Sequence, residues 1–271
     1  MEKARDVVIK IFKVLIRPEM KILPGHLAFY MFMAMIPLVA LITTVAVALS
    51  ISTDVIREAM TEYLPLSIIG ILNSVTEGRG INFNIMVFYT SALLLASNGA
   101  YSMINSSNEI YKIKPRNIIS RRMKAIVMTF IMLGLFIFLL VVPVFGDTLS
   151  SIIREITGDG TIVSFIRQML VILKYPLIML ILFFGIKIMY IMGPDQEIPS
   201  KTTNKGAIFT SVLWILATEI YAFYAENFTS YDVFYGSISN ILILMMWLYF
   251  LSYIYVLGLI INANDYRREI N

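Results

Sequence analysis

Residues 238–262, ISNILILMMWLYFLSYIYVLGLIIN, indicate the fold class most clearly, because they run for 25 residues without a charged side chain. Five further stretches share this length and apolar character: residues 27–50, 82–104, 122–146, 171–193 and 205–227. A helix needs about 20 mostly apolar residues to cross a hydrocarbon core, and lipid offers no partner for an unpaired backbone amide. The sequence therefore predicts an all-α, polytopic membrane protein whose fold is a bundle of six transmembrane helices.

Composition supports the same class. The chain of 271 residues is 58% hydrophobic and only 15% charged, and its mean hydropathy is +0.79. The longest connections, residues 51–81 and 147–170, are too short to hold a core of their own, so we expect one domain over 1–271. The chain has no cysteine, so it has neither a disulfide framework nor a thiolate metal site.

The start of the chain is predicted to form an amphipathic helix on the cytoplasmic face, within residues 1–26. Charged side chains recur there every three or four residues, and apolar side chains fill the opposite side. Such a helix lies on a membrane surface, where its cations contact anionic lipid head groups. These cations are Lys3, Lys10, Lys13 and Arg17. The alternative is a helix packed on the cytoplasmic loops of its own bundle.

The connections are also predicted to have local structure. Pro18 and the pair Pro24 and Gly25 are predicted to turn the chain into the first span. On the outer side, residues 54–64 and 147–157 alternate charged and apolar side chains at helical spacing. We expect a short amphipathic helix in each.

Lys and Arg residues indicate the orientation, because cationic connections stay in the cytoplasm. They gather before the first span, around the connection between the second and third spans, before the fifth span and at the C-terminus; these residues are Lys3, Arg5, Lys10, Lys13, Arg17, Lys21, Lys112, Lys114, Arg116, Arg121, Arg122, Lys124, Lys201, Lys205, Arg267 and Arg268. The opposite side holds only Arg57, Arg79, Arg154 and Arg167. Both termini are therefore predicted to be cytoplasmic.

The polar residues of the second span share one face of a helix. Their intervals of 7, 4, 3 and 4 residues correspond to whole helical turns. They are Ser91, Asn98, Ser102, Asn105 and Glu109. We predict that this face lines a hydrated cavity open toward the cytoplasm, which would be a path for a substrate. The alternative is a role in interhelical hydrogen bonding, at about 0.6 kcal/mol per bond.

Glu219 lies well inside the fifth span, where a carboxylate costs about 2.5–3.5 kcal/mol. We expect it either to belong to the same polar path, or to be a neutral side chain hydrogen-bonded to Asn98 or to a hydroxyl of the last span. Three prolines lie inside spans and remove backbone hydrogen bonds there. They are predicted to kink their helices and to serve as gating positions: Pro37, Pro143 and Pro176.

The residue inventory argues against an enzyme and against a bound metal or cofactor. The single histidine, His26, and the absence of cysteine leave no His cluster, no HExxH site and no Cys nucleophile. The sequence also has no Gly-rich phosphate loop. The net charge of +4 follows from the topology, so no nucleic-acid partner is expected.

Three strings of the sequence carry a family resemblance: LAFYMFMAMIPL (27–38), SNGAYSMINSSNEIYKIKPR (97–116) and NFTSYDVFYGSISNILILMMWLYFLSYIYVLGLIINA (227–263). They resemble the YihY/BrkB family of bacterial inner-membrane proteins, and the resemblance covers nearly the whole chain. The matching positions include Pro37, Asn105, Arg116, Tyr190, Pro194, Tyr231, Tyr235, Gly236, Ser237, Trp247, Tyr249, Gly258 and Asn262. Two positions depart from the pattern: Ala34 stands where a Ser is usual and Ile260 where a Glu is usual.

The resemblance implies six transmembrane helices, cytoplasmic termini and location in the bacterial inner membrane. The family was once labelled a ribonuclease, and its members have since been proposed to move lipids or other amphipathic molecules. Because Ile260 replaces the usual carboxylate, a mechanism that depends on an acid in the last span is in doubt for this chain.

Three functions remain open. The favoured one is a transporter or flippase-like exporter of a lipid or other amphipathic small molecule. The alternatives are a non-catalytic membrane scaffold or assembly factor and, less favoured, a membrane-bound ribonuclease. Small residues that permit close helix approach, within one chain or between copies in an oligomer, are Gly70, Gly99, Gly134 and Gly258.

Overall fold

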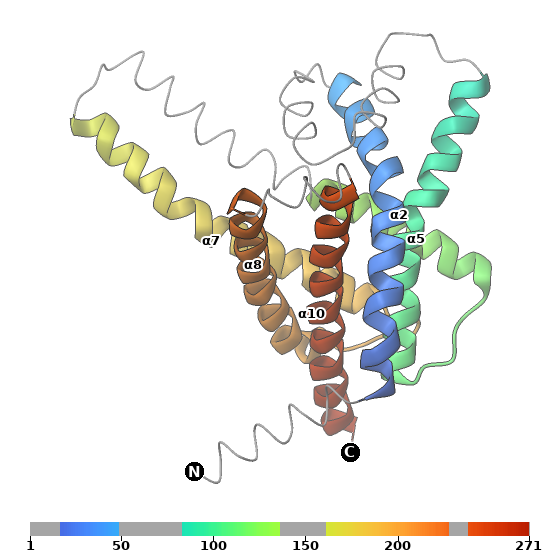
Figure 1. Cartoon of the computed structure of the whole chain (residues 1–271). Helices are drawn as coiled ribbons and strands as arrows, with labels where there is room; N and C mark the ends of the chain where they lie inside the picture. Colours follow the sequence, from blue (N-terminus) through green and yellow to red (C-terminus); the bar gives the residue numbers. More distant parts are fainter. Residues whose placement is uncertain (1–16, 49–82, 136–160, 228–237, 271) are drawn as a thin grey trace.

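The computed structural model describes residues 17–48, 83–135, 161–227 and 238–270. These residues are helical apart from short connections, and none of them forms a strand. The helices are α2 (Pro18–Ala48), α5 (Phe83–Tyr111), an unlabelled helix over residues 118–135, α7 (Thr161–Met192), the short 3₁₀ helix η1 (Ser200–Thr203), α8 (Asn204–Asn227) and α10 (Ile238–Ile270) (Figure 1). The predicted all-α class is confirmed for this part of the chain.

Each apolar stretch of the sequence overlaps one of the long helices. Two helices of the described part are long and apolar enough to cross a membrane, at Ser200–Tyr224 and Ile241–Ile270, and the apolar helix Pro176–Met192 is shorter. The bundle of six spans therefore stays a prediction. Several other predictions concern residues outside the described part: Pro143, the cations Lys3, Lys10 and Lys13, and the amphipathic segments 54–64 and 147–157.

The predicted turn at Pro24 and Gly25 is wrong, because α2 begins at Pro18 and continues through both residues. Proline is well tolerated at the first helical position, and Pro24 removes only one further backbone hydrogen bond. Packing compensates for that loss, since Met20 and Leu27 on the same helix are fully buried. Residues 18–26 are thus the first turns of α2 and not part of a separate surface helix. Arg17 directly precedes them.

α10 holds the bundle together (Figure 1). It packs against α2 on one side and α8 on the other, α5 packs against α2, and α7 runs obliquely to pack against α8. Pro37 lies inside α2 and Pro176 inside α7, as their spans predict. The core between the helices is apolar and includes Met103, Ile104, Val256 and Leu259.

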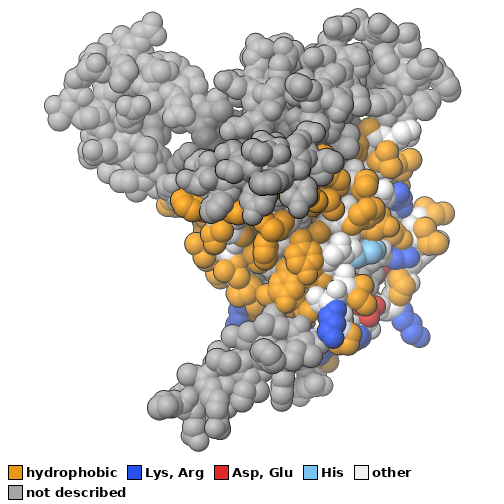
Figure 2. Space-filling model, viewed as in Figure 1, with side chains coloured by type: hydrophobic (Ala, Val, Ile, Leu, Met, Phe, Trp, Pro, Cys, Tyr) orange, Lys and Arg blue, Asp and Glu red, His pale blue; other side chains and the backbone are white. Residues whose placement is uncertain are grey.

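The distribution of side chains is that of a protein surrounded by hydrocarbon. Large apolar residues such as Phe130, Phe184, Leu216 and Phe250 are about half exposed. Figure 2 shows hydrophobic side chains over most of the described surface on one face, with Lys and Arg toward its lower and right-hand margins. Buried positions, in contrast, include many polar side chains: Ser97, Ser102, Ser106, Ser107, Asn108, Thr129, Thr210, Ser211, Ser252 and Asn262. A water-soluble domain rarely exposes so much contiguous apolar surface.

Several of the residues that carry the family resemblance have a structural role in the contact between α7, α8 and α10. The hydroxyl of Tyr190 donates to the carbonyl of Tyr255 at 2.9 Å and lies 2.6 Å from the hydroxyl of Thr210. Gly258 leaves room for both hydroxyls, because a Cβ there would overlap them. One turn further along α10, the side-chain oxygen of Asn262 accepts a hydrogen bond from the backbone amide of Gly206, at 2.8 Å.

The turn after α5 directs the chain toward the next helix. Lys112 adopts a positive φ of 60°. Its amide bonds the carbonyl of Glu109, and the amide of Ile113 bonds that of Asn108. This is a Schellman motif with a lysine at the position that usually holds glycine. The side-chain oxygen of Asn117 then caps the helix over residues 118–135 by accepting from the amide of Ile119.

We predict that Gly258→Ala destabilises the protein by about 1–3 kcal/mol, because the added methyl group overpacks the contact with Tyr190 and Thr210. The measurement is the thermal unfolding midpoint of the purified protein in detergent. The matched control is Gly25→Ala, where a Cβ meets nothing within 4 Å and the higher helix propensity of alanine is worth about 0.5–1 kcal/mol. Equal midpoints for the two variants would contradict the close contact at Gly258.

Candidate polar pocket between three helices

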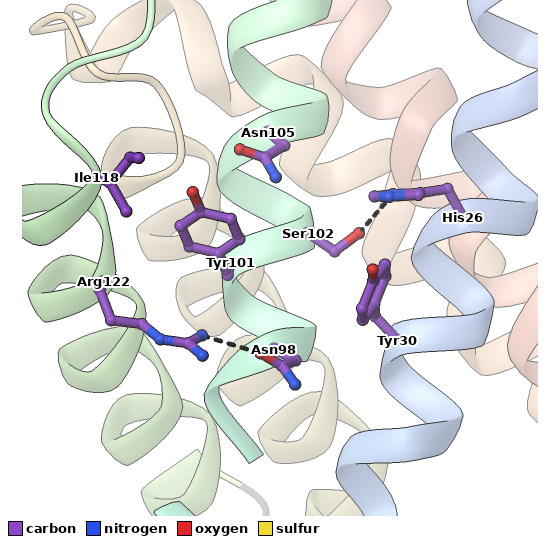
Figure 3. A pocket seen from close by; sticks show the side chains of 8 residues that line it. All are labelled: His26, Tyr30, Asn98, Tyr101, Ser102, Asn105, Ile118 and Arg122. Carbon is purple, nitrogen blue, oxygen red and sulfur yellow. Dashed lines mark hydrogen bonds between the residues drawn. The ribbon is translucent and has the colours of Figure 1, made fainter. Parts of the chain in front are cut away.

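A pocket of about 330 Å³ lies against α5, between α2 and the helix over residues 118–135 (Figure 3). In Figure 3, α2 contributes His26 and Tyr30, and the helix over residues 118–135 contributes side chains from the opposite side. We name it the arginine pocket, and its lining residues are His26, Tyr30, Asn98, Tyr101, Ser102, Asn105, Ile118 and Arg122. Half of these come from α5, at intervals of three and four residues, so they share one face of that helix.

Two arginines of the helix over residues 118–135 bond to α5, and one of them, Arg122, lines the pocket. Arg122 Nη1 donates to Asn98 Oδ1 at 2.9 Å, and Arg121 Nη1 donates to Asn105 Oδ1 at 2.8 Å. The ring of Tyr101 lies between these two contacts. The guanidinium carbons of Arg121 and Arg122 are 5.3 and 5.5 Å from its centroid, within the range of a cation–π interaction. The tyrosine and the two asparagines therefore hold both guanidinium groups against α5.

The opposite wall of the pocket is held by a hydrogen bond between helices. His26 Nδ1 and Ser102 Oγ are 3.0 Å apart, and either can donate, depending on the tautomer of the imidazole. The ring of Tyr30 meets the ring of His26 edge to face, with 4.8 Å between their centroids. This side of the pocket thus offers an imidazole and a hydroxyl, both able to donate or accept.

Among the described residues, no carboxylate lines the arginine pocket. Acids on the helices that form the pocket and on the connection after α7 pair with lysines instead: Lys112 with Glu19 at 3.2 Å and Glu109 at 3.8 Å, and Lys124 with Asp195 at 3.3 Å. Among the ion pairs formed by the described residues, none includes either arginine. The pocket is therefore cationic.

The structure brings together three of the residues predicted for the polar path, Asn98, Ser102 and Asn105. Ser91 and Glu109 lie on the same helix but are exposed and do not line the pocket. Glu219 is exposed on α8 and also lies outside the pocket. Asn98, an alternative partner expected for it, bonds Arg122 instead.

Sequence reasoning assigned no binding role to Tyr30, Tyr101, His26 or Arg122. It counted Arg122 among the cations that indicate orientation. Its position in the sequence could have indicated a role. Arg122 lies only five residues after Asn117, at the start of the helix that follows the polar face of α5.

A buried carboxylate, Asp195, joins several chain segments at the end of the bundle where the pocket lies. The side chain of Asp195 is 1% exposed and accepts hydrogen bonds from Asn108 Nδ2 at 2.7 Å and from the backbone amide of Arg116 at 3.1 Å. Asn108 also accepts from the amide of Asp195. The ammonium of Lys124 bonds the carboxylate and the carbonyls of Gly193 and Pro194. These bonds join the connection after α7 to the end of α5 and to the helix that carries the arginines.

The environment keeps Asp195 ionised. Burial acts to raise its pKa, but the amide of Arg116, the side chain of Asn108 and the ammonium of Lys124 together hold the pKa of this carboxyl below its ordinary value near 3.8. The backbone at the start of α2, assisted by Lys112, similarly lowers the pKa of Glu19, against a smaller opposing effect of burial.

Comparison with known proteins finds one family model and several relatives that match most of the chain. The family model described as "Virulence factor BrkB" matches residues 11–269. The protein YfkH of Bacillus subtilis, whose name describes it only as ribonuclease-like, is 27% identical over 253 residues that cover 90% of both chains. A UPF0761 membrane protein of Psychromonas ingrahamii is 24% identical over 262 residues, 90% of this chain and 82% of its own. No solved structure matches the chain significantly.

We predict that Asp195→Asn destabilises the protein by about 1–3 kcal/mol at pH 7. The loss is smaller than the about 3–5 kcal/mol of a fully buried pair, because Lys124 is partly exposed and keeps two carbonyl partners. The lowered pKa stabilises the folded state above pH 3.8 and ceases to do so as the pH falls below that value. The difference in unfolding midpoint between wild type and variant should therefore shrink below about pH 4.

The matched control for this measurement is Asp265→Asn. It breaks the pair that Asp265 forms with Lys205 at 2.8 Å, in which the lysine is 70% exposed. Exposed pairs contribute about 0–1 kcal/mol, so this variant should unfold close to wild type at every pH. A loss at Asp265→Asn as large as that at Asp195→Asn would show that neither value reports the buried bonds.

Proposed function

This chain belongs to the virulence factor BrkB family of membrane proteins, and we propose that it moves a lipid or another amphipathic molecule across the bacterial inner membrane. In this proposal it is a transporter or flippase-like exporter, and the arginine pocket receives the polar part of the substrate. The observation that carries the proposal is a polar, cationic pocket between helices whose outer faces are apolar.

The volume of the pocket and the apolar residues on its flanking helices support this proposal. Its volume of about 330 Å³ is at the lower end of the range for ligand sites, so it suits a head group better than a whole lipid. Exposed apolar residues lie on both flanking helices. Phe29, between the lining residues His26 and Tyr30 on α2, is 45% exposed, and Ile118 both lines the pocket and is 68% exposed. A polar head can enter while a tail stays against this apolar surface.

The proposal also includes an orientation in the membrane, which the cationic residues indicate. The cation-rich segments gather at one end of the bundle, where Lys112 pairs with Glu19 and Arg267 donates to the carbonyl of Ile110. If cationic connections stay in the cytoplasm, this end faces inward and both termini are cytoplasmic. Six spans and a pocket open toward the cytoplasm are the arrangement we propose.

A scaffold or assembly factor is the second candidate. It is favoured by one observation: every predicted polar-path residue in the pocket already bonds another helix, Asn98 and Asn105 through arginines and Ser102 through His26. Polar side chains can hold helices together with no substrate involved. The ribonuclease-like name of YfkH suggests a third function, for which the described residues offer no group of three side chains placed to hold a metal.

We predict that Asn98→Leu abolishes lipid translocation, lowering the rate at least about tenfold, because leucine fills the pocket and removes the partner of Arg122. The measurement is the flipping of a fluorescently labelled phospholipid in proteoliposomes, read by quenching from outside. The matched control is Thr218→Leu, a similar polar-to-apolar change at an exposed position of α8.

The outcome separates the two candidates. Lost flipping with a normal unfolding midpoint supports a substrate path through the pocket. Lost flipping together with lost folding supports the scaffold, in which Asn98 serves packing. Wild-type protein that leaves the lipid in place under every condition contradicts the transporter proposal.

A further inference from the structure

We propose that the arginine pocket is selective for an anionic, phosphate-like head group, which the guanidinium of Arg122 binds directly. This inference rests on the proposed function and deepens it, since it names the chemical class of the substrate. The shared chemistry is a tetrahedral oxyanion. It can come from a phospholipid or from a soluble phosphate ester, and the experiment below distinguishes these two sources.

The donors of Arg122 are the first argument. A guanidinium has five N–H donors in a rigid fork that matches phosphate geometry. Within the described residues, Arg122 uses one of them, toward Asn98. Its neighbour Arg121 uses two, toward Asn105 and the backbone carbonyl of Arg116. Arg122 thus keeps most of its donors available beside the pocket.

The charge balance is the second argument. Partly buried arginines in proteins usually face a carboxylate, but here both face amides, which carry no charge to neutralise them. The ring of Tyr101 attracts both cations only through its quadrupole. Placing two guanidinium groups on one tyrosine concentrates positive charge, and an anion in the pocket is the partner that relieves it.

The remaining lining residues fit the same ligand. His26 and Ser102 lie across the pocket from Arg122, on the far side of α5 in Figure 3, and the tautomer of the imidazole decides which of the two can donate to an oxygen of the ligand. A phosphate ester offers several oxygen acceptors, so it can bond both walls at once. A zwitterionic choline head group also carries a trimethylammonium, which the two guanidinium groups repel.

Exposed apolar residues on the two flanking helices can contact the apolar tail of an amphipathic ligand. Ile118, Ile119 and Met123 are each more than half exposed at the start of the helix that carries the arginines. On α2, Phe29 and Met33, which lie within three residues of the lining residue Tyr30, are also exposed. A ligand with its anion at Arg122 can therefore lay an acyl or alkyl tail along either flank.

The test compares binding of two phospholipids with identical tails, phosphatidylglycerol and phosphatidylcholine, to the full-length protein in detergent by native mass spectrometry. Wild type should prefer the anionic lipid by about tenfold, and Arg122→Gln should remove the preference, as expected for the loss of a charge-assisted hydrogen bond. Asn98→Asp is the second variant. It places a carboxylate on the existing 2.9 Å contact, so it neutralises Arg122 without removing a partner or leaving a cavity.

Asn117→Asp is the matched control. It adds the same charge at an exposed helix cap, which aspartate fills as well as asparagine does, and it should keep the preference. Equal binding of both lipids by wild type, or a preference that survives both Arg122→Gln and Asn98→Asp, overturns the proposal. Glycerol phosphate added as a competitor identifies the source: competition as strong as that of the lipid assigns a soluble phosphate ester, and weak competition assigns a lipid.

Binding and transport can fail separately. Selective binding without flipping in proteoliposomes leaves the anionic pocket standing and contradicts the transporter proposal. Flipping of phosphatidylcholine as fast as phosphatidylglycerol, with no selective binding, contradicts the anionic pocket and leaves transport standing.

Discussion

The described structure depends on one constraint: a polar group enclosed by apolar helices is costly unless it finds a partner within the protein. Neither hydrocarbon nor a packed apolar core supplies a hydrogen bond, and an unpaired buried group costs about 1–3 kcal/mol. The hydroxyl of Tyr190 meets this constraint by reaching a carbonyl of α10 and Thr210 of α8. Gly258 makes that reach possible, because any side chain there would occupy the same space.

The same constraint separates two regions at one end of the bundle. Around Asp195 every charge is matched, since a buried carboxylate faces an ammonium, an amide side chain and a backbone amide. Around Arg122 no described residue matches the charge, and a pocket lies beside it. The first region is therefore a structural contact in which the charges are paired. The second has the chemistry of the anion site that we propose, and the bonds of Asp195 hold the helix that carries Arg122 in place.

Hydropathy and helical period were enough to predict the helices and the shared face of Asn98, Ser102 and Asn105, because both depend only on local sequence. The partners of that face were not predictable. Arg122 comes from the next helix, and its direction depends on the Schellman turn at Lys112, where a non-glycine residue gives little signal. Glu219 illustrates a different limit. Its depth in the span followed from counting residues, but its exposed side of α8 depends on how α8 packs against α7 and α10.

Arg122 also shows why a cation that indicates orientation can have a second role. Positive residues near the cytoplasmic end of a span are common, so their presence alone carries no functional information. What distinguishes Arg122 is its surroundings: an amide partner in place of an acid, an aromatic ring shared with a second arginine, and a pocket on its open side. A cation kept only for topology needs none of these. Their combination at a single residue is therefore the strongest argument that the polar face of α5 binds a ligand as well as a neighbouring helix.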